Sequence, residues 1–251
     1  MITATPRSPN EQFDEYADAY RDLLDQSVSA SGETGEYFAN FKARYMRKVL
    51  GDNFSGVALD YGCGIGLLTS SLLKSFPKAR VIGFDPSATS IQLARRTAAG
   101  AQLTTDESTL PSSVDTIVLA NVMHHILPEQ RTRLMSALAE RLSPSGRLFI
   151  FEHNPVNPLT RVAVCNCILD HDAILLRPPE MAAYLCEVQL HVLRHDYIVF
   201  FPRRLKWLRP MEKFLTWCPL GAQYAFVGTP NQTEHRIASG AQSDVLCGSR
   251  F

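Results

Sequence analysis

A glycine-rich turn after an apolar stretch constrains the fold of this chain more than any other feature of its sequence. Residues 57–69 read VALDYGCGIGLLT. Glycines let a backbone bend sharply and approach a ligand where a Cβ atom would stand in the way. A dinucleotide-binding turn has the spacing GxGxxG, but Leu67 stands where its third glycine would be. Asp60, two residues before Gly62, would repel a pyrophosphate and attract an ammonium group. The turn therefore favours a ligand with a nucleoside and a cation over NAD, although a tight turn without any ligand has a similar pattern.

Strand-like and helix-like stretches alternate from about residue 56 to residue 187. Such alternation predicts a mainly parallel sheet with helices on both faces. The expected strands are 56–60, 80–84, 101–104, 114–120 and 146–152, the expected helices are 65–75, 87–99, 129–142 and 179–187, and a later strand pair is expected at 190–201 and 223–228.

Three segments lie outside this alternation. Residues 10–50 are predicted to form two helices, the first with Phe13, Tyr16 and Tyr20 at helical spacing. These aromatic residues would close a lid that keeps water from the site, or they would simply pack a helix on the domain. We expect 1–50 to be a helical lid, 51–228 the binding domain, 153–178 a substrate-side insertion within it, and 229–251 a polar tail without a core role.

Charge balance and cysteine spacing exclude several classes of function. The chain of 251 residues has 25 Lys and Arg against 25 Asp and Glu, a formal net charge of zero, whereas a protein that neutralises many phosphates usually carries a basic excess. Nucleic acid is therefore not expected as a partner. The six cysteines form no CxxC pair and show no zinc-ligand spacing. Because the sequence shows neither a signal peptide nor a long apolar run, we expect a cytoplasmic protein without a membrane span.

The stretch from Asp60 to Gly66, DYGCGIG, resembles the glycine-rich motif of class I S-adenosylmethionine-dependent methyltransferases. Further landmarks are similar and follow in the family's order: Asp85 ends VIGFD, TDESTLP stands at 105–111, and ANVMHH at 120–125. Residues 13–20 are similar to the N-terminal helix of the ubiquinone/menaquinone-biosynthesis-like branch, apart from the Arg21 that follows them. The resemblance covers roughly residues 10–228. It implies a Rossmann-like α/β fold, with a seven-stranded, mostly parallel sheet whose last strand is antiparallel.

The resemblance also implies S-adenosylmethionine as methyl donor and names the residues that would hold it. Asp85 would accept hydrogen bonds from both ribose hydroxyls, since one carboxylate can accept two at once. Asp106 would accept a hydrogen bond from the adenine amino group. Asp60 would orient the methionyl end of the donor, and Asn121 would meet the methionyl amine. The other expected cofactor residues are the three glycines of the turn and one aromatic residue of the lid: Gly62, Gly64, Gly66 and Tyr20.

Polar side chains at the ends of the fourth and fifth predicted strands are the candidates for catalysis. His124 and His125 follow the fourth strand, and Glu152 and His153 end the fifth; ligands bind beyond the carboxyl ends of such strands. One of them would act as a general base toward a hydroxyl or amine of the acceptor. Adjacent helical residues diverge by about 100°, so only one of the paired histidines is expected to face the acceptor. Each histidine could instead be structural, and the pattern specifies no metal site, so no metal is predicted.

We therefore expect methyl transfer to a small organic molecule, with S-adenosylhomocysteine as co-product. The alternatives are a catalytically silent binding or scaffold protein that keeps the cofactor fold, and a methyltransferase for a lipid-like or phosphorylated acceptor. The basic, Trp-bearing segment 203–209 would permit peripheral membrane contact, or it would be a solvated face. The turn NVMH at 121–124 lacks the [DN]PP[YF] pattern common among nucleic-acid amino methyltransferases. The sequence leaves the acceptor atom and the oligomeric state open.

Overall fold

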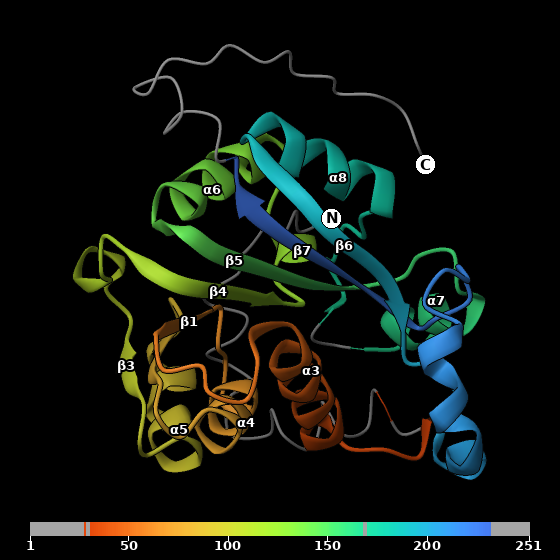
Figure 1. The fold of residues 1–251 in the computed structure, drawn as a ribbon. Coiled ribbons are helices and arrows are strands. Elements are labelled where there is room, and N and C mark those ends of the chain that lie inside the picture. The colour runs from red at the N-terminus through yellow and green to blue at the C-terminus, as the bar shows by residue number, and fades with distance from the viewer. Residues whose placement is uncertain (1–27, 29–30, 168–169, 232–251) are drawn as a thin grey trace, which may run out of the picture.

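The alternating segments fold into a sheet of seven strands (Figure 1), in a computed structural model that describes residue 28 and residues 31–167 and 170–231. The strand order is β3-β2-β1-β4-β5-β7-β6. Neighbouring strands from β3 to β5 are parallel, while β7 runs antiparallel to both β5 and β6. This confirms the predicted mostly parallel sheet with an antiparallel last strand. The strands are β1 (Val57–Tyr61), β2 (Arg80–Phe84), β3 (Gln102–Thr104), β4 (Val114–Ala120), β5 (Leu142–His153), β6 (Leu190–Ile198) and β7 (Gln223–Pro230).

Helices cover both faces of the sheet (Figure 1). The helices α3 (Gly35–Leu50), α4 (Leu67–Ser75) and α5 (Ala88–Thr97) lie on one face, and α6 (Pro128–Glu140) and α8 (Pro178–Glu187) lie on the other. Met46 and Leu72 are fully buried in the core of the first face, as are Met135 and Leu185 in the core of the second. Because both faces are covered, the parallel strands share one open edge at their carboxyl ends, where ligands bind in sheets of this kind.

Short polar residues and prolines set the starts of the helices. Ser87 caps α5, its hydroxyl accepting from the backbone N–H of Ser90 at 3.0 Å. Pro128 stands in the first turn of α6 and Pro178 in that of α8. Capping side chains satisfy N–H groups that have no partner within the helix, and proline lacks that N–H altogether. These local signals explain why the predicted helix starts agree with the structure to within two residues.

β5 begins at Leu142 rather than at residue 146. Leu142 pairs with Val114, and the register then shifts so that Arg147 pairs with Thr116. The intervening Ser-Pro-Ser-Gly stretch, which reads as punctuation after a helix, is therefore an irregularity within the strand. A Cβ atom at Gly146 would lie 2.9 Å from the carbonyl oxygen of Ser143, so glycine permits the tight path.

The segments outside the alternation are described in part. Of the expected lid, α3 is described, and Ala39 and Met46 bury its inner face against the sheet. The first expected helix, with Tyr20, lies outside the described residues, as do residues 232–251 of the expected tail. The insertion at 153–178 contains the short helix α7 (Pro158–Cys165), whose first N–H groups are capped by Asn157. Among the residues that the structure describes, none of the helices has the length and apolar character needed to cross a membrane.

Candidate active site

A cavity of about 1240 Å³ opens at the carboxyl ends of the parallel strands. A pocket for one small ligand usually measures about 300–1000 Å³, so this cavity has room for a cofactor and an acceptor together. Its walls come from the glycine turn after β1, the residues that follow β4 and β5, the helices α3 and α7, and the segment leading from β6 into the 3-10 helix η6 (Arg203–Phe214).

The glycine turn is held against β2. The N–H group of Gly62 donates to the carbonyl oxygen of Phe84 at 2.8 Å. Gly62, Gly64 and Gly66 have positive φ values of 76°, 51° and 81°, a region that glycine adopts without strain. Gly62 and Gly64 line the cavity, but Gly66 does not. A Cβ atom at Gly66 would lie 3.0 Å from the Cβ atom of Ala94, so this glycine lets α4 begin close to α5.

Two carboxylates beside the turn also line the cavity. Asp85 accepts hydrogen bonds from the N–H of Gly64 at 2.7 Å and from the N–H of Ser87 at 3.0 Å. Asp60 is buried in β1 and accepts from the hydroxyl of Thr69 at 2.6 Å. Burial raises the pKa of Asp60 to about 7, although the Thr69 hydrogen bond acts in the opposite direction. A cationic ligand group beside Asp60 would favour its ionised form.

Asp106 is placed differently from the expectation. Its carboxylate accepts from the N–H and the hydroxyl of Ser108, at 2.9 and 2.6 Å, and so caps the short 3-10 helix η3 (Glu107–Thr109). These hydrogen bonds lower the pKa of the exposed Asp106 carboxyl. Asp106 is not part of the cavity wall, whereas its neighbour Glu107 is. The hydroxyl of Tyr61 donates to Glu107 at 3.2 Å. The acid that the cavity meets at this edge is therefore Glu107.

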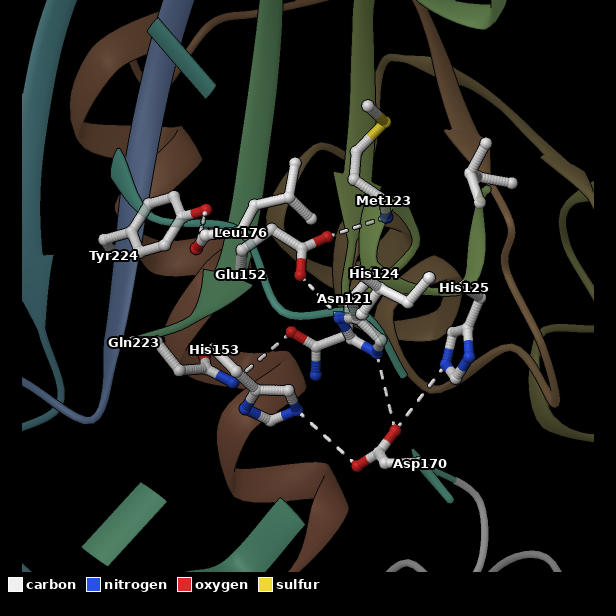
Figure 2. A network of polar contacts seen from close by, with 12 residues as sticks. Asn121, Met123, His124, His125, Glu152, His153, Asp170, Leu176, Gln223 and Tyr224 are labelled. Atoms are coloured by element: carbon white, nitrogen blue, oxygen red, sulfur yellow. Dashed lines mark hydrogen bonds and ion pairs between the residues drawn. The ribbon is translucent and has the colours of Figure 1, made fainter. Parts of the chain in front are cut away.

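Asn121 turns the chain out of β4 in a left-handed conformation with φ of 60°, which asparagine adopts more readily than most residues. Its N–H donates to the carbonyl oxygen of Phe151 at 2.8 Å, and its side-chain oxygen accepts from Gln223 at 3.4 Å (Figure 2). Asn121 and Gln223 both line the cavity. Asn121 thus presents a polar side chain at the carboxyl end of β4.

A buried histidine–carboxylate pair joins the ends of β4 and β5 (Figure 2). Glu152 accepts from the N–H of Met123 at 2.8 Å and from Nδ1 of His124 at 2.5 Å. Glu152 is 1% exposed and His124, in the 3-10 helix η4 (Met123–His125), is 0% exposed. Neither residue lines the cavity. In this arrangement the two residues support the site from behind, so direct contact with an acceptor, which the sequence suggests for them, is not available.

Asp170, from the insertion, brings three histidines together (Figure 2). Its Oδ1 lies 3.4 Å from Nε2 of His124 and 3.6 Å from Nε2 of His125, and its Oδ2 lies 3.8 Å from Nε2 of His153. The ring centroids of His124 and His125 are 4.2 Å apart. Although both rings turn a nitrogen toward Asp170, only His125 of this pair lines the cavity. His125, His153 and Asp170 line the cavity.

Burial and neighbouring charges give the three histidines different ionisation. Burial alone would lower the pKa of His124, but Glu152 and Asp170 beside it raise this pKa to about 9. Burial and the charge of His124 lower the pKa of His125 and that of His153 to about 4. At neutral pH His124 is therefore a cation, whereas the two histidines in the cavity wall are neutral imidazoles with a nitrogen that can accept a proton.

Comparisons with known proteins find methyltransferases. A family profile described as "Methyltransferase domain" matches residues 59–148. An uncharacterized methyltransferase of Geobacillus sp. (strain WCH70) is 29% identical over 142 residues, which cover 54% of this chain and 63% of the relative. The trans-aconitate 2-methyltransferase of Azoarcus sp. (strain BH72) is 32% identical over 120 residues, which cover 45% of this chain and 46% of the relative. The match thus spans less than two thirds of each relative's length.

Solved structures extend the likeness to most of the fold. The magnesium protoporphyrin IX methyltransferase of Synechocystis PCC 6803, with bound S-adenosylmethionine, aligns with a TM-score of 0.63 at 14% identity over 92% of this chain and 100% of that one. A TehB-like S-adenosylmethionine-dependent methyltransferase from Corynebacterium glutamicum aligns with a TM-score of 0.59 at 17% identity over 88% and 99%. Residues 59–148 therefore match a methyltransferase domain, and the fold is that of S-adenosylmethionine-dependent methyltransferases of known structure.

Lys42 is a residue of the cavity that the sequence motifs do not indicate. It stands on α3, lines the cavity and is 6% exposed. Burial lowers its pKa to about 8, against the opposing effect of the Glu152 and Asp60 carboxylates. Lys42 follows Ala39 by three residues and precedes Met46 by four. This spacing places it on the buried face of the helix and is the signal that would have found it.

Asp170 is the second such residue, and hydrogen bonds fix the segment that follows it. The N–H of Ile174 donates to the carbonyl oxygen of His124 at 2.8 Å. The hydroxyl of Tyr224, on β7, donates to the carbonyl oxygen of Leu176 at 3.0 Å (Figure 2). These bonds attach the insertion to the ends of the sheet strands. No local pattern marks Asp170 in the sequence, since its role depends on this tertiary contact.

The basic segment 203–209 begins η6, which contains no buried residue. Arg209 is tied down rather than free: its guanidinium donates to Glu33 at 2.7 Å and lies 4.5 Å from the ring centroid of Tyr37. Arg209 thus anchors η6 beside α3 at the rim of the cavity.

An exposed apolar surface continues from this segment. Leu205, in η6, is 39% exposed. Trp207, Phe214 and Trp217 are 71%, 67% and 76% exposed. Leu159, on α7 in the cavity wall, is 79% exposed. Large apolar side chains are therefore exposed both at the cavity and along η6.

Proposed function

We propose that this protein transfers the methyl group of S-adenosylmethionine to a small organic acceptor, giving a methylated product and S-adenosylhomocysteine. The proposal rests on one observation: the glycine turn with its carboxylates and the histidine cluster line different parts of the same cavity. The glycine turn and its carboxylates follow β1 and β2, and the histidine cluster follows β4 and β5, which are the next strands in the sheet. Two ligands with different chemistry would therefore meet inside one enclosure.

The residues beside the glycine turn fit S-adenosylmethionine. Asp85 would accept from the ribose hydroxyls, and the backbone of Gly62 and Gly64 leaves room for the nucleoside. Asp60 and the polar side chain of Asn121 would face the methionyl ammonium group. Lys42, the buried cation of the same cavity, would face the methionyl carboxylate. When bound, the donor supplies a methyl group that its sulfonium has already activated, so the protein mainly positions the two reactants.

The remaining expectations for the donor and the lid keep their place in the proposal with two changes. Tyr20 and the first helix would close over the cavity as a lid, and the insertion at 153–178 would form the acceptor side. The acid offered to the adenine amino group is Glu107 rather than Asp106, because Glu107 lines the cavity. Gly66 serves the packing of α4 on α5 instead of contact with the donor.

On the acceptor side, His125 and His153 are the residues that would take a proton. Both line the cavity, and both carry a ring nitrogen near Asp170. A positioned base contributes about 10²–10⁴-fold to such reactions. His124 and Glu152 are positioning residues in this proposal, since they hold the cluster from behind and do not reach the cavity.

The proposal is tested by calorimetry with S-adenosylmethionine and by turnover with a pool of small metabolites. We expect micromolar binding of the donor, and formation of S-adenosylhomocysteine when a low-molecular-weight cell extract is added. Asp85→Ala is the matched variant and should bind more weakly. Donor binding without co-product in any extract would favour a silent scaffold, and the absence of donor binding would overturn the proposal.

A lipid-like acceptor is the second candidate, and the exposed surface on η6 favours it. Trp207 and Phe214 on η6 and Trp217 just after it are exposed, in a stretch of chain that also carries the basic residues Arg203 and Lys206. Basic residues combined with exposed aromatic rings are typical of segments that lie on an anionic membrane surface. Such a surface beside the cavity would bring a lipid-like acceptor to the site.

Vesicle sedimentation separates the two candidates. A lipid-like acceptor predicts binding to vesicles with about one third phosphatidylserine and weaker binding to vesicles of phosphatidylcholine alone. The double variant Trp207→Ser/Trp217→Ser should lose this binding while retaining its affinity for S-adenosylmethionine. Equal recovery of wild type and variant with either vesicle would leave the soluble small molecule as the acceptor class.

A further inference from the structure

Three side chains on the acceptor side of the cavity direct a metal-ligand atom toward a common point. They are His124, His125 and Asp170; each offers one ligand atom, a ring nitrogen or a carboxylate oxygen, and these atoms all lie within 4.8 Å of one another. Asp170 Oδ1 is 3.4 Å from Nε2 of His124 and 3.6 Å from Nε2 of His125. Ligand atoms about 2.0–2.2 Å from a tetrahedral metal are separated by about 3.3–3.6 Å. The observed distances from Asp170 to the two nitrogens therefore match the edges of a coordination tetrahedron.

The Nε2 atom of His124 lacks a satisfactory partner. It is buried, and within the described residues no hydrogen bond of good geometry reaches it. A buried polar atom without a partner is costly, and each such atom calls for an explanation. The other ring nitrogen, Nδ1, is committed to Glu152 at 2.5 Å. That bond fixes the ring so that Nε2 points at Asp170 (Figure 2).

The Glu152–His124 pair is the outer support that metal-binding histidines usually have. A metal-ligating histidine almost always donates its second nitrogen to a carboxylate or carbonyl group, which sets its orientation. The N–H of Met123 holds Glu152 in turn at 2.8 Å. A bond from Ile174 to the carbonyl oxygen of His124 fixes the segment after Asp170. The site is therefore held in shape from both sides.

Charge and access also suit a dication. Two carboxylates, Glu152 and Asp170, converge on the cluster, and a divalent ion that displaces the proton of His124 would balance both. The side chains of His125 and Asp170 are 20% and 15% exposed and line the cavity, so an ion can enter from it. Two histidines and one carboxylate leave coordination positions open.

We propose that His124, His125 and Asp170 bind one divalent transition-metal ion of the zinc class on the acceptor side of the cavity. The sequence alone predicts no metal, because Asp170 lies far along the chain from the paired histidines. The open positions face the cavity and would hold an oxygen or nitrogen donor of the acceptor, an inference that rests on the proposed methyl transfer. His153, beside Asp170, stays available as the base.

The test is a metal titration of the full chain after chelation and desalting. Zn²⁺ is followed by calorimetry and elemental analysis, and Co²⁺ by its visible absorption in a four-coordinate site. We expect one ion per chain. His125→Ala and Asp170→Asn should weaken binding more than about 100-fold, and Glu152→Gln should weaken it by about 10–100-fold, as outer-shell changes do.

His171 and Asp172 provide the matched control, because they are the same residue types on the same segment but are 79% and 74% exposed. His171→Ala and Asp172→Asn should leave the affinity for Zn²⁺ unchanged. Circular dichroism and S-adenosylmethionine affinity show whether each variant is folded, and they stay independent of the metal result. The proposal is overturned if wild type binds no ion below about 100 µM, or if Asp170→Asn and Asp172→Asn bind alike. If the metal-free chain still binds S-adenosylmethionine, a failure of the metal proposal does not contradict the proposed methyl transfer.

Discussion

The cofactor wall of the cavity takes its functional atoms from two short stretches of chain, whereas the histidine wall collects them from elements far apart in the sequence. On the cofactor wall, the turn at residues 60–66 and the end of β2 supply both backbone and carboxylates, and Asp85 bonds directly to Gly64. On the histidine wall, β4, β5 and the insertion each contribute one part of a single cluster around Asp170.

The two walls also differ in how their polar groups are satisfied. The carboxylate of Asp85 accepts hydrogen bonds from two backbone N–H groups, which fix its position. The histidine wall instead separates the pKa values of like groups, with His124 raised to about 9 and His153 lowered to about 4. Titratable groups whose environments push their pKa values apart are typical of acid–base sites. In the proposed function, the cofactor wall therefore binds the donor and the histidine wall takes the proton of the acceptor.

The largest expected effect separates these two tasks. His153→Gln should lower turnover by about 10²–10⁴-fold, because it removes a proton acceptor from the cavity wall. It should leave the affinity for S-adenosylmethionine within about twofold of wild type. Initial rates and calorimetry on the same preparation provide both numbers, and His171→Gln, an exposed histidine, is the control. If the loss in turnover is less than about tenfold, positioning carries the catalysis and the acceptor is already nucleophilic at neutral pH.

The next effect acts on the cofactor wall. Asp85→Ala should weaken donor binding by about 2–3 kcal/mol, roughly 30–150-fold, because hydrogen bonds to a charged acceptor are the stronger class. Asp85→Asn keeps the side-chain volume and one acceptor oxygen, so its loss should be smaller. Metal affinity should not change in either variant. Calorimetry in which wild type and Asp85→Ala bind equally would remove Asp85 from the ribose contact.

The cofactor wall was largely predictable from sequence because its interactions are local. A strand, a turn with three glycines and a carboxylate at the end of the next strand follow within 26 residues, from Asp60 to Asp85. The apolar runs of β1 and β4 and the prolines at the helix starts fixed most element boundaries within a few residues. The different placement of Asp106 is also local, because its carboxylate caps η3 through Ser108.

The histidine wall was predictable only in part, because its geometry is tertiary. Strand ends bring His125 and His153 to the same edge, and a parallel sheet implies this contact. Burial of Glu152 and His124 behind that edge depends on the insertion closing over them, which no spacing in the sequence specifies. Asp170 belongs to that insertion, and its role follows from the bonds that hold the segment after it to the sheet.

The pH dependence of donor binding tests the two charged side chains of the cofactor wall, Asp60 and Lys42. Binding of the methionyl group needs Asp60 ionised and Lys42 protonated, and the pKa values in the free protein are about 7 and about 8. Affinity should therefore rise as pH increases to about 7, and fall as pH increases beyond about 8, by roughly tenfold per unit outside this window. The α-amino group of the donor itself titrates at about 7.7–8.0. Because this range overlaps that of Lys42, the alkaline limb of wild type alone does not identify the lysine. The variant Lys42→Met should weaken binding at pH 7.5 and make the alkaline limb less steep.

Asp60→Asn is the complementary variant, since it should remove the acidic limb and leave the alkaline one. Asp85→Ala should lower the whole curve and shift its acidic limb to lower pH, because the charge of Asp85 contributes to the raised pKa of Asp60. A profile that is flat from pH 6 to pH 9 in wild type would show that neither Asp60 nor Lys42 meets the charged end of the donor.

The smallest effect distinguishes two adjacent acids at the adenine end of the cofactor wall. Glu107→Ala should weaken donor binding by roughly three- to tenfold, the usual worth of one hydrogen bond to a carboxylate acceptor that is partly solvated. Asp106→Ala should change donor affinity by less than about twofold, because its carboxylate is engaged by Ser108 and lies outside the cavity wall. Repeating both measurements with S-adenosylhomocysteine, which has the same adenine, should give the same ratio. A larger loss for Asp106→Ala than for Glu107→Ala would restore Asp106 as the adenine contact. It would also mean that η3 rearranges when the donor binds, so that the cofactor wall is less rigid than its backbone hydrogen bonds indicate.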